Sequence, residues 1–441
     1  IKGLLKMNNV KKFKVNKFTS NTIWLILEKI FQLILGLVVG IWTARYLGPS
    51  NYGILNYGAS FIAFFSVICS LGLENVIIKY FVDYPRKNNI ILFSAIIIRF
   101  VTSIISILVI CLIVSITHYD EKLVIAVITL QSLALIFNSL DTIDYWFQSR
   151  LMSMYVVIAK SVTRFIVSIW KVYLLISNAS LQLFALSSSI EAMILGVILL
   201  VVYFKKNPIN FSFSKYYSKE LFLNGYHFIL SGLLVTLFTQ MDRIMLGNLI
   251  GQESVGIYSV ASNIATLWYF VPLAVINSAR PIILKMKQIS IVEYQEKLKQ
   301  LYAFIFWLGL LVSLFITVCS NLIIQTLYGQ QYIEAAIPLA ILIWASVFSL
   351  LGTARNIWIV SEGVNKYTKY YFLIGMFVNF VLNYIFINYF GVVGSAVATL
   401  IAQIITTIVA PLFFAKTRES TYLMSQAMML KGVIPKRKAE K

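Results

Sequence analysis

Long runs of apolar residues, separated by short polar turns, dominate this chain. Each run holds at least the roughly 20 residues that an α-helix needs to cross a bilayer, and the longer runs are expected to tilt or to extend beyond the hydrocarbon. The pattern predicts an all-α integral membrane protein with twelve transmembrane helices. Their predicted ranges are 20–46, 52–80, 90–116, 122–149, 153–177, 181–204, 221–249, 253–283, 300–321, 333–359, 368–389 and 391–415.

The composition excludes an ordinary soluble fold. Of 441 residues, 59% are hydrophobic and 12% are charged, whereas soluble domains carry about 25% charged residues. Lys and Arg outnumber Asp and Glu by 37 to 17, which gives a net charge of +20. Nucleic-acid binding would need those cations on a wet surface, and a mean hydropathy of +0.84 leaves little such surface. We therefore expect no nucleic-acid partner.

The positions of the basic residues predict how the chain crosses the bilayer. If the Lys-rich amino terminus is cytoplasmic, nearly all basic residues outside the spans share that side, and only Arg45 and Lys122 lie on the other. Basic connections tend to stay in the cytoplasm, so both termini are predicted to be cytoplasmic. The predicted parts are a basic tail 1–19, a six-helix bundle 20–204, a linker 205–220, a second six-helix bundle 221–415 and a basic tail 416–441.

An internal repeat supports two related halves. The segments "LGPSNYGILNYGAS" (47–60) and "IGQESVGIYSVASN" (250–263) align without gaps, so that Gly48 matches Gly251 and Gly53 matches Gly256. Each copy joins the first two helices of its half, with one glycine for a turn and a second where helices pack closely. We therefore expect two pseudo-symmetric bundles of the same orientation, related by an axis along the membrane normal.

Four segments carry a family resemblance: "TARYLGPSNYGILNYGAS", "DYWFQSRLMSMYVVIAKSVTRF", "MDRIMLGNLIGQESVGIYSVAS" and "LYGQQYIEAAIPLAILIW". In this order, and on a plan of six plus six helices, they resemble the Wzx-type oligosaccharide and polysaccharide flippases of the multidrug/oligosaccharidyl-lipid/polysaccharide (MOP) exporter superfamily. The resemblance runs from about residue 18 to residue 415. It implies a MATE-like fold with a central cavity that opens alternately to the two sides of the membrane.

The resemblance also implies a substrate and a location. The expected substrate is an undecaprenyl-pyrophosphate-linked oligosaccharide, moved from the cytoplasmic to the outer leaflet of the bacterial cytoplasmic (inner) membrane. The product would feed capsule, O-antigen or exopolysaccharide assembly, with a polysaccharide polymerase machinery as a further expected partner. The chain would be a transporter and not an enzyme. The alternatives are an ion-coupled multidrug exporter of the same superfamily and, from another class, a membrane-embedded polysaccharide polymerase or glycosyltransferase.

Ionisable residues inside the predicted spans are the candidates for function. Each costs at least about 2.5–3.5 kcal/mol near the bilayer centre, so we expect them to face a partner or a watery cavity. Residues near the ends of their helices, such as Glu74, Arg280 and Arg355, have the alternative of snorkelling to the interface. The full set is Glu28, Lys29, Glu74, Arg99, Asp141, Asp144, Lys160, Arg164, Lys171, Glu191, Asp242, Arg243, Arg280 and Arg355.

The fourth and fifth predicted helices carry stripes of opposite charge. Three- and four-residue steps place one stripe on one face of the fourth helix and the other on one face of the fifth. Antiparallel packing around a turn near residue 152 predicts that Asp144 lies level with Lys160 and Asp141 nearly level with Arg164. Two structural ion pairs are the simpler interpretation. The stripe on the fourth helix is Asn138, Asp141, Asp144 and Gln148, and the stripe on the fifth helix is Lys160, Arg164 and Lys171.

The second interpretation is that the cations left over bind the substrate's pyrophosphate. Phosphate oxygens match the planar donors of arginine, and Glu191 offsets part of the positive charge. Lys79 and Arg280, near repeat-related helix ends, would form a cationic mouth, although ordinary membrane anchors are the alternative interpretation. The pyrophosphate-binding candidates are Arg99, Lys160, Arg164, Lys171, Lys79 and Arg280.

The remaining candidates concern energy coupling and the sugar. Because no G-x-x-x-x-G-K-[ST] motif is present, ATP is not the expected energy source. The alternatives are coupling to a H⁺ or Na⁺ gradient, the membrane potential, and downstream consumption of the product. The three cysteines lie in separate apolar stretches without metal-ligand spacing, so we expect no metal site and no further cofactor. Tyr145 and Trp146 are candidates for stacking on sugars, with interfacial anchoring as the alternative. The ion-coupling or charge-pairing candidates are Glu28, Lys29, Asp141, Asp144, Glu191, Asp242 and Arg243.

Overall fold

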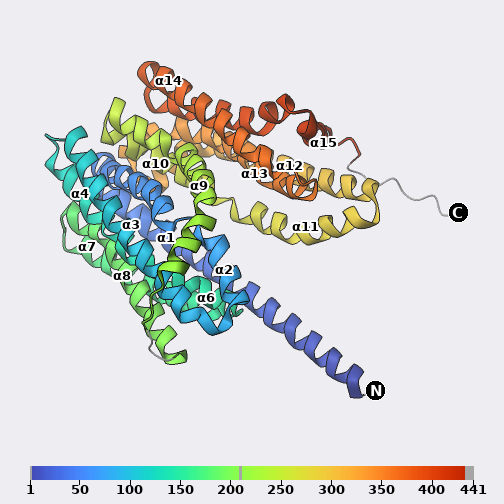
Figure 1. The fold of residues 1–441 in the computed structure, drawn as a ribbon. Helices are drawn as coiled ribbons and strands as arrows, with labels where there is room; N and C mark the ends of the chain where they lie inside the picture. Colours follow the sequence, from blue (N-terminus) through green and yellow to red (C-terminus); the bar gives the residue numbers. More distant parts are fainter. Residues whose placement is uncertain (1, 208–210, 433–441) are drawn as a thin grey trace. The chain divides into compact units, whose positions relative to one another are not determined.

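The computed structural model describes residues 2–207 and 211–432, with side chains from residue 31 onward except that of Asn75. Every regular element in these ranges is helical (Figure 1). The α-helices are α1 (Lys2–Ser70), α2 (Leu73–Asp83), α3 (Asn88–Thr117), α4 (Lys122–Ser132), α5 (Ala134–Asn138), α6 (Thr142–Ser149), α7 (Ser153–Ile176), α8 (Leu181–Lys206), α9 (Lys215–Leu249), α10 (Gln252–Leu267), α11 (Phe270–Ile289), α12 (Ile291–Tyr328), α13 (Ala336–Ser361), α14 (Thr368–Ile404) and α15 (Arg418–Met428).

The helices are long and apolar enough for a multi-pass membrane protein. Within the described residues, nine stretches meet the length and hydropathy of a membrane span, or ten if the bent pair α10–α11 is one span. Two of the nine are too long for a single crossing, namely 31–70 and 365–413. Each contains a glycine outside helical geometry, Gly48 in the first and Gly391 in the second. Division at these glycines makes the structure compatible with the twelve predicted spans.

The chain folds as two compact units. Unit 1 comprises residues 1–47 and 58–233, and unit 2 comprises residues 48–57 and 234–441. The core of unit 1 joins α2, α3, α6, α7, α8 and the start of α9 through buried side chains such as Phe81, Leu92, Phe147 and Tyr203. These residues are apolar on the inward faces of their helices, as burial of a helix stripe requires.

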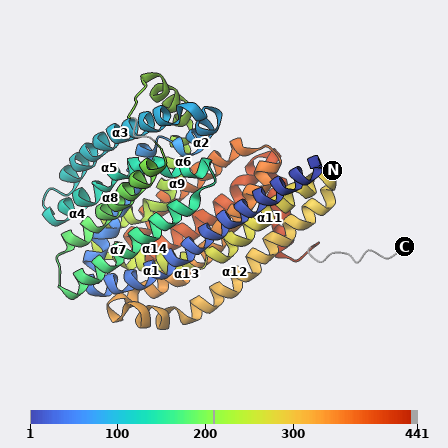
Figure 2. The same ribbon diagram turned by 90° about the horizontal axis from the view of Figure 1, so that it is seen from below.

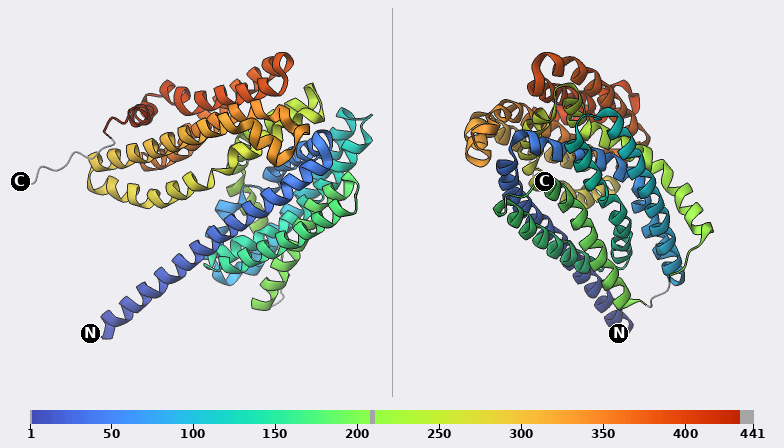
Figure 3. Two further views of the ribbon diagram at one scale, coloured as in Figure 1. Left: turned by 180° about the vertical axis from the view of Figure 1, so that it is seen from behind. Right: turned by 90° about the vertical axis from the view of Figure 1, so that its left-hand side faces the viewer.

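The core of unit 2 is built mainly on α12 and α13, which run side by side (Figure 2). Tyr302, Leu351 and Trp358 are almost fully buried there. α11 turns back into α12 (Figure 3). Ser290 precedes α12, and its hydroxyl accepts the backbone N–H of Glu293 and caps the new helix. The carboxyl-terminal helix α15 packs on α12. The sequence analysis treated this part of the chain as a basic tail, and no helix was predicted there.

The two copies of the repeat meet inside unit 2. Gly48 (φ 73°) and Gly251 (φ 127°) both have the positive φ that favours glycine, as predicted for the turn position. The second glycine of each copy packs against the other copy: a Cβ at Gly53 would overlap the backbone of Gln252, and a Cβ at Gly256 would overlap the backbone of Pro49. The contact is reciprocal because Gly53 and Gly256 are equivalent positions of the repeat, and so are Pro49 and Gln252.

The fourth predicted helix, 122–149, is not a continuous α-helix. It breaks after α4 and again at a 3-10 turn, Ser139–Asp141, before α6 begins. A 3-10 turn has about 3.0 residues per turn instead of 3.6, so the face presented by Asp141 is rotated relative to a regular helix. The same segment carries several of the predicted site residues.

Candidate functional site

A pair of opposite charges joins α6 to α7 in unit 1. Lys160 Nζ lies 2.7 Å from Asp144 Oδ2, and Gln148 Nε2 donates to Asp144 Oδ1 at 3.0 Å. The side chain of Asp144 is 11% exposed and that of Lys160 is 31% exposed. The contact agrees with the predicted antiparallel register. Lys160 is therefore committed to an ion pair and is a weak candidate for binding pyrophosphate.

The second predicted level pair, Asp141 with Arg164, is wrong. Arg164 Nε instead lies 3.7 Å from Glu191 Oε1, on α8. The 3-10 turn that ends at Asp141 explains the difference, because it changes the direction of that side chain relative to α7. Arg164 and Glu191 are both more than one-third exposed, so their interaction is a weak one.

Arg99 is a buried cation held by neutral groups. Its residue is 4% exposed. Its Nη1 donates to Thr142 Oγ1 at 2.7 Å, and its Nε lies 3.4 Å from the carbonyl oxygen of Cys69. Neither partner carries a charge, so the positive charge is oriented without being neutralised by these contacts. Asp141, in the 3-10 turn before α6, is a carboxylate that interacts with Arg99 electrostatically.

Lys171 lies partly buried on α7 and has no hydrogen bond or ion pair within the part of the chain that the structure describes. Arg164 and Glu191 are the charged groups in electrostatic range. Arg99 and Lys171 are thus the two buried or partly buried cations of unit 1 that have no ion pair among the described residues. Both were predicted as candidates for binding an anion.

Lys79 and Arg280 are exposed, on α2 and α11, as both the cationic mouth and the ordinary anchor require. Glu74 is exposed as well. The side chains of Glu28 and Lys29 lie outside the described residues.

Asp242, on α9 in unit 2, has the most elaborate polar surroundings of the predicted candidates. The residue is 4% exposed. Four neutral side chains from α10 and α14 donate to its carboxylate, namely Tyr258 OH (2.5 Å), Asn379 Nδ2 (3.2 Å), Asn383 Nδ2 (2.7 Å) and Thr399 Oγ1 (2.8 Å). Adjacent Arg243 points elsewhere and donates to Gln240 Oε1 at 2.9 Å.

The Asp242 site also contains oxygen atoms without partners. The amide oxygens of Asn379 and Asn383 and the hydroxyl of Ser395 are buried without a hydrogen bond among the described residues. A carboxylate, two amide oxygens and hydroxyl oxygens are hard ligands of the kind that small cations prefer. Each oxygen of the Asp242 carboxylate already accepts two hydrogen bonds, so a proton or a monovalent cation would have to displace or turn one of the four donors. The sequence marked Asp242 alone, because its partners lie on helices far along the chain.

The aromatic candidates are not equally available. Trp146 is 6% exposed and makes edge contacts with the rings of Phe147 and Tyr203, each with centroids 5.0 Å apart. Its ring belongs to the core of unit 1, so the prediction that it stacks on sugars is not supported by its position. Tyr145 is partly buried and packs on the same core.

Arg355 is buried, so the alternative of snorkelling to the interface does not apply to it. It is 2% exposed, and its Nη2 donates to the carbonyl oxygen of Thr407 and contacts Met424 Sδ at 3.6 Å. α15 contributes to this burial, because its buried residue Met424 contacts Arg355. No helix was predicted in this part of the chain. Arg355 ties together α13, the π-helical turn Ile405–Val409 and α15.

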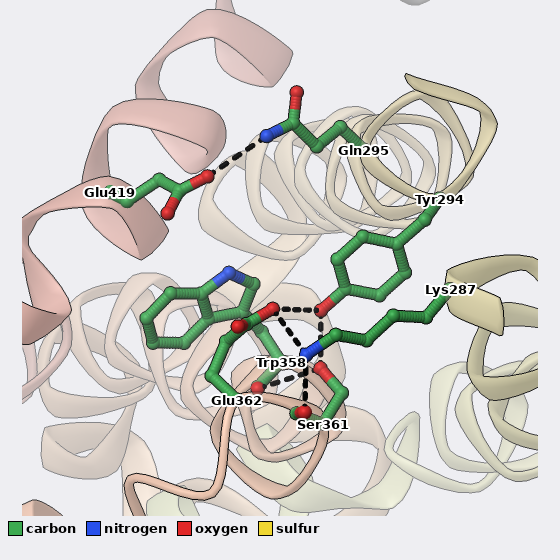
Figure 4. A network of polar contacts seen from close by, with 7 residues as sticks. All are labelled: Lys287, Tyr294, Gln295, Trp358, Ser361, Glu362 and Glu419. Carbon is green, nitrogen blue, oxygen red and sulfur yellow. Dashed lines mark hydrogen bonds and ion pairs between the residues drawn. The ribbon is translucent and has the colours of Figure 1, made fainter. Parts of the chain in front are cut away.

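A polar network at one end of unit 2 was missed by the sequence analysis (Figure 4). Lys287 Nζ lies 2.8 Å from Glu362 Oε1 and also donates to the carbonyl oxygen of Ser361. The hydroxyl of Tyr294 contacts Ser361 Oγ and donates to Glu362 Oε1 at 3.2 Å. The network fixes the α11–α12 hairpin to the end of α13. Its residues lie at helix ends that fall outside the predicted ranges 253–283, 300–321 and 333–359, where the sequence offers no periodicity to pair them.

Comparison with known families places these sites in context. The model of the family described as "Polysaccharide biosynthesis protein" matches residues 18–287, and the MatE family model matches residues 228–385. The capsular polysaccharide biosynthesis protein CapF of Staphylococcus aureus is 24% identical over 266 residues, which cover 52% of this chain and 66% of CapF. The probable flippase AglR of Haloferax volcanii is 25% identical over 176 residues, 39% of this chain and 37% of AglR. The matches thus span less than two thirds of either relative's length.

Solved structures of similar fold extend over nearly the whole chain. The lipid II flippase MurJ in an inward closed conformation gives a TM-score of 0.67 at 17% identity, covering 92% of this chain and 91% of that one. An inward-facing multidrug resistance MATE family transporter of the MOP superfamily also gives 0.67, at 14% identity, covering 90% and 96%. These likenesses establish a MATE- and MurJ-like fold for this chain.

Proposed function

We propose that this chain, which belongs to the polysaccharide biosynthesis protein family, is a flippase for a lipid-linked oligosaccharide. The finer proposal is an undecaprenyl-pyrophosphate-linked repeat unit moved by alternating access from the cytoplasmic to the outer leaflet. The product would serve capsule, O-antigen or exopolysaccharide assembly. CapF and AglR, by their names, support the class of process, and the MurJ-like fold supports the mode of transport.

The observation that carries this proposal is the uncommitted positive charge inside unit 1. Arg99 is buried and hydrogen-bonded to neutral groups only, and Lys171 has no partner within the described residues. Holding such cations in an apolar environment costs free energy, and an anionic ligand would offset that cost. A pyrophosphate supplies two phosphate groups, and arginine donates to phosphate oxygens in a planar fork.

Energy coupling is the second part of the proposal. The Asp242 site holds a buried carboxylate among neutral donors and unpartnered oxygens. We propose that Asp242 takes up Na⁺ or H⁺ and releases it during the transport cycle. Binding a cation there changes the charge of a buried site, and a ligand with different affinity for two conformations shifts their populations.

The competing function is export of cationic drugs, which the MatE family match favours. A cavity for cations should present unpaired carboxylates. In unit 1, Asp144 is paired with Lys160, Glu191 lies beside Arg164, and Asp141 interacts electrostatically with Arg99, whereas Lys171 has no ion pair among the described residues. This distribution favours an anionic substrate.

Reconstitution distinguishes the two functions. The full chain would be placed in liposomes with a fluorescent undecaprenyl-pyrophosphate oligosaccharide, and access of a membrane-impermeant quencher would report translocation. The expected result is protein-dependent translocation that falls at least tenfold in Arg99→Met and Lys171→Met. Lys122→Met, an exposed lysine of the same unit, is the matched control. Transport of a cationic dye, without translocation of the lipid-linked oligosaccharide, would contradict the proposal.

A further inference from the structure

A cavity of about 480 Å³ lies at one end of unit 1, away from Arg99 and Lys171 in the sequence. Its lining residues come from the connection between α2 and α3 and the start of α3, from the end of α6, and from residues 207 and 212. Its volume falls within the range typical of small-ligand sites. The lining side chains that matter here are Arg86, Asn88, Asn89, Trp146, Arg150 and Ser212.

Two guanidinium groups line this cavity, and no lining residue is acidic. Arg150 is held in place by Asn88. With the Asn88 amide nitrogen donating to the carbonyl oxygens of Phe81 (3.2 Å) and Tyr84 (3.3 Å), the amide oxygen accepts from Arg150 Nη2 at 2.6 Å. That single contact leaves the other donors of the guanidinium for a ligand. Arg86, on the neighbouring 3-10 turn, is exposed and keeps its donors as well.

Two of the neutral lining residues, Asn89 and Ser212, offer further donors, whereas the amide nitrogen of Asn207 donates to the carbonyl oxygen of Tyr203 at 3.1 Å. Asn89 Oδ1 accepts the hydroxyl of Tyr203 at 2.5 Å, so the atom of this amide left for a ligand is its nitrogen. Ser212 Oγ is buried and has no hydrogen bond among the described residues. Trp146 supplies an apolar wall. A buried hydroxyl without a partner carries a free-energy cost, which a ligand oxygen in this cavity would remove.

We propose that this cavity binds a phosphate or diphosphate group. Two arginines, an amide nitrogen and a hydroxyl provide donors without a competing carboxylate, and this pattern matches the oxygens of a phosphate. If the proposed flippase function holds, the site receives the diphosphate of the lipid-linked substrate before translocation. A soluble diphosphate has the same chemistry, so the two sources must be separated by experiment.

The surroundings strengthen attraction of an anion. Lys87, Lys205, Lys206 and Lys215 lie in the same connections or at the adjoining helix ends, and the acids near them or near the lining in sequence are Asp83, Asp144 and Glu220. Lys206 Nζ already donates to Tyr155 OH at 3.0 Å, and Lys87 lies over the ring of Tyr217. These lysines therefore raise the local potential without lining the cavity. Lys87 offers a matched control for Arg86.

Binding would be measured on the full chain in neutral-lipid nanodiscs by isothermal titration calorimetry. One arm titrates inorganic diphosphate, and the other compares nanodiscs with and without undecaprenyl diphosphate. We expect Arg86→Gln and Ser212→Ala to weaken binding at least tenfold and threefold, respectively, and Lys87→Gln to change it less than twofold. Because Arg150→Gln removes the contact to Asn88, its thermal unfolding would be measured in parallel.

Each outcome decides a separate point. Binding of the lipid-linked form alone identifies a headgroup site, and binding of the free form alone identifies a site for a soluble ligand. Absence of both at millimolar concentration, or equal losses in Arg86→Gln and Lys87→Gln, would overturn the proposal. If the chain binds diphosphate here but does not translocate the lipid-linked oligosaccharide, the result supports the proposed binding site and contradicts the proposed flippase function.

Discussion

Lys160 Nζ lies 2.7 Å from Asp144 Oδ2 and joins two helices that a polar turn separates. The pair is partly buried, so each charge depends on the other. Removing one partner leaves an uncompensated charge, whereas removing both leaves none. The pair therefore stabilises the contact between α6 and α7. Arg99 and Lys171 remain as the buried or partly buried cations of unit 1 without an ion pair among the described residues.

Breaking that pair should destabilise the protein. Lys160→Met is expected to lower the free energy of unfolding by about 1–3 kcal/mol, the cost of an unsatisfied charged group. The double variant Asp144→Asn with Lys160→Met should lose less than the sum of the two single variants. Thermal unfolding in detergent micelles would measure the three variants. Additive losses would show that the pair does not act as a unit.

Lys171 should show the opposite relation between stability and function. Because it has no partner within the described residues, Lys171→Met removes an isolated charge from an apolar environment and should leave stability unchanged or raise it by about 1 kcal/mol. Translocation should nevertheless fall at least tenfold. The measurements are thermal unfolding and liposome translocation on one preparation. Loss of stability together with transport would make Lys171 a packing residue instead.

Asp242 should determine the response to cations. If Na⁺ binds there, saturation at about 100 times the dissociation constant stabilises the fold by about 2.7 kcal/mol relative to an equal concentration of choline. Asp242→Asn should abolish this stabilisation and the dependence of transport on a Na⁺ gradient. If the ion is a proton, the variant should abolish the response to a pH gradient instead.

The control for Asp242 is Asp144→Asn, which removes another buried carboxylate but leaves the Asp242 oxygens in place. It should keep the cation response. A Asp242→Asn variant that folds and retains its full response to both gradients would exclude this residue from coupling.

The reciprocal glycine contact should tolerate no side chain. A Cβ at Gly53 or Gly256 would overlap backbone atoms that cannot rotate away, so either alanine variant should lose at least about 2 kcal/mol, as overpacked cores do. Gly36→Ala is the matched control, because nothing lies within 4 Å of its added Cβ. An alanine there should be neutral or stabilising by up to about 1 kcal/mol. Equal stability of all three variants would contradict the close contact.

The sequence predicted the helical layout well, because apolar length decides where a chain can cross a bilayer. The repeat predicted both positive-φ glycines, since their role is local. The Asp144–Lys160 pair followed from the short turn between two adjacent helices. Such features depend on neighbours that are close in sequence.

Features that depend on distant segments were missed. The pairing of Asp141 with Arg164 fails because a regular helix was predicted where the structure has a 3-10 turn before α6. Snorkelling was one of two alternatives for Arg355, and the sequence did not predict α15, whose Met424 contacts the buried guanidinium. The donors to Asp242 come from α10 and α14, and no local pattern links them to α9. Tertiary contacts of this kind require the folded chain.

The repeat contact has a consequence for how the protein is made. Residues 48–57 belong to unit 2, yet they precede nearly all of unit 1 in the chain. During synthesis, the packing contact of Gly53 cannot form until Gln252 and Gly256 have been made and inserted. Domains generally fold as units while the chain emerges, but unit 2 cannot close until its earliest segment and its later segments are both present. A chain that ends before residue 250 therefore lacks the segment against which Gly53 packs, and its unit 2 stays incomplete.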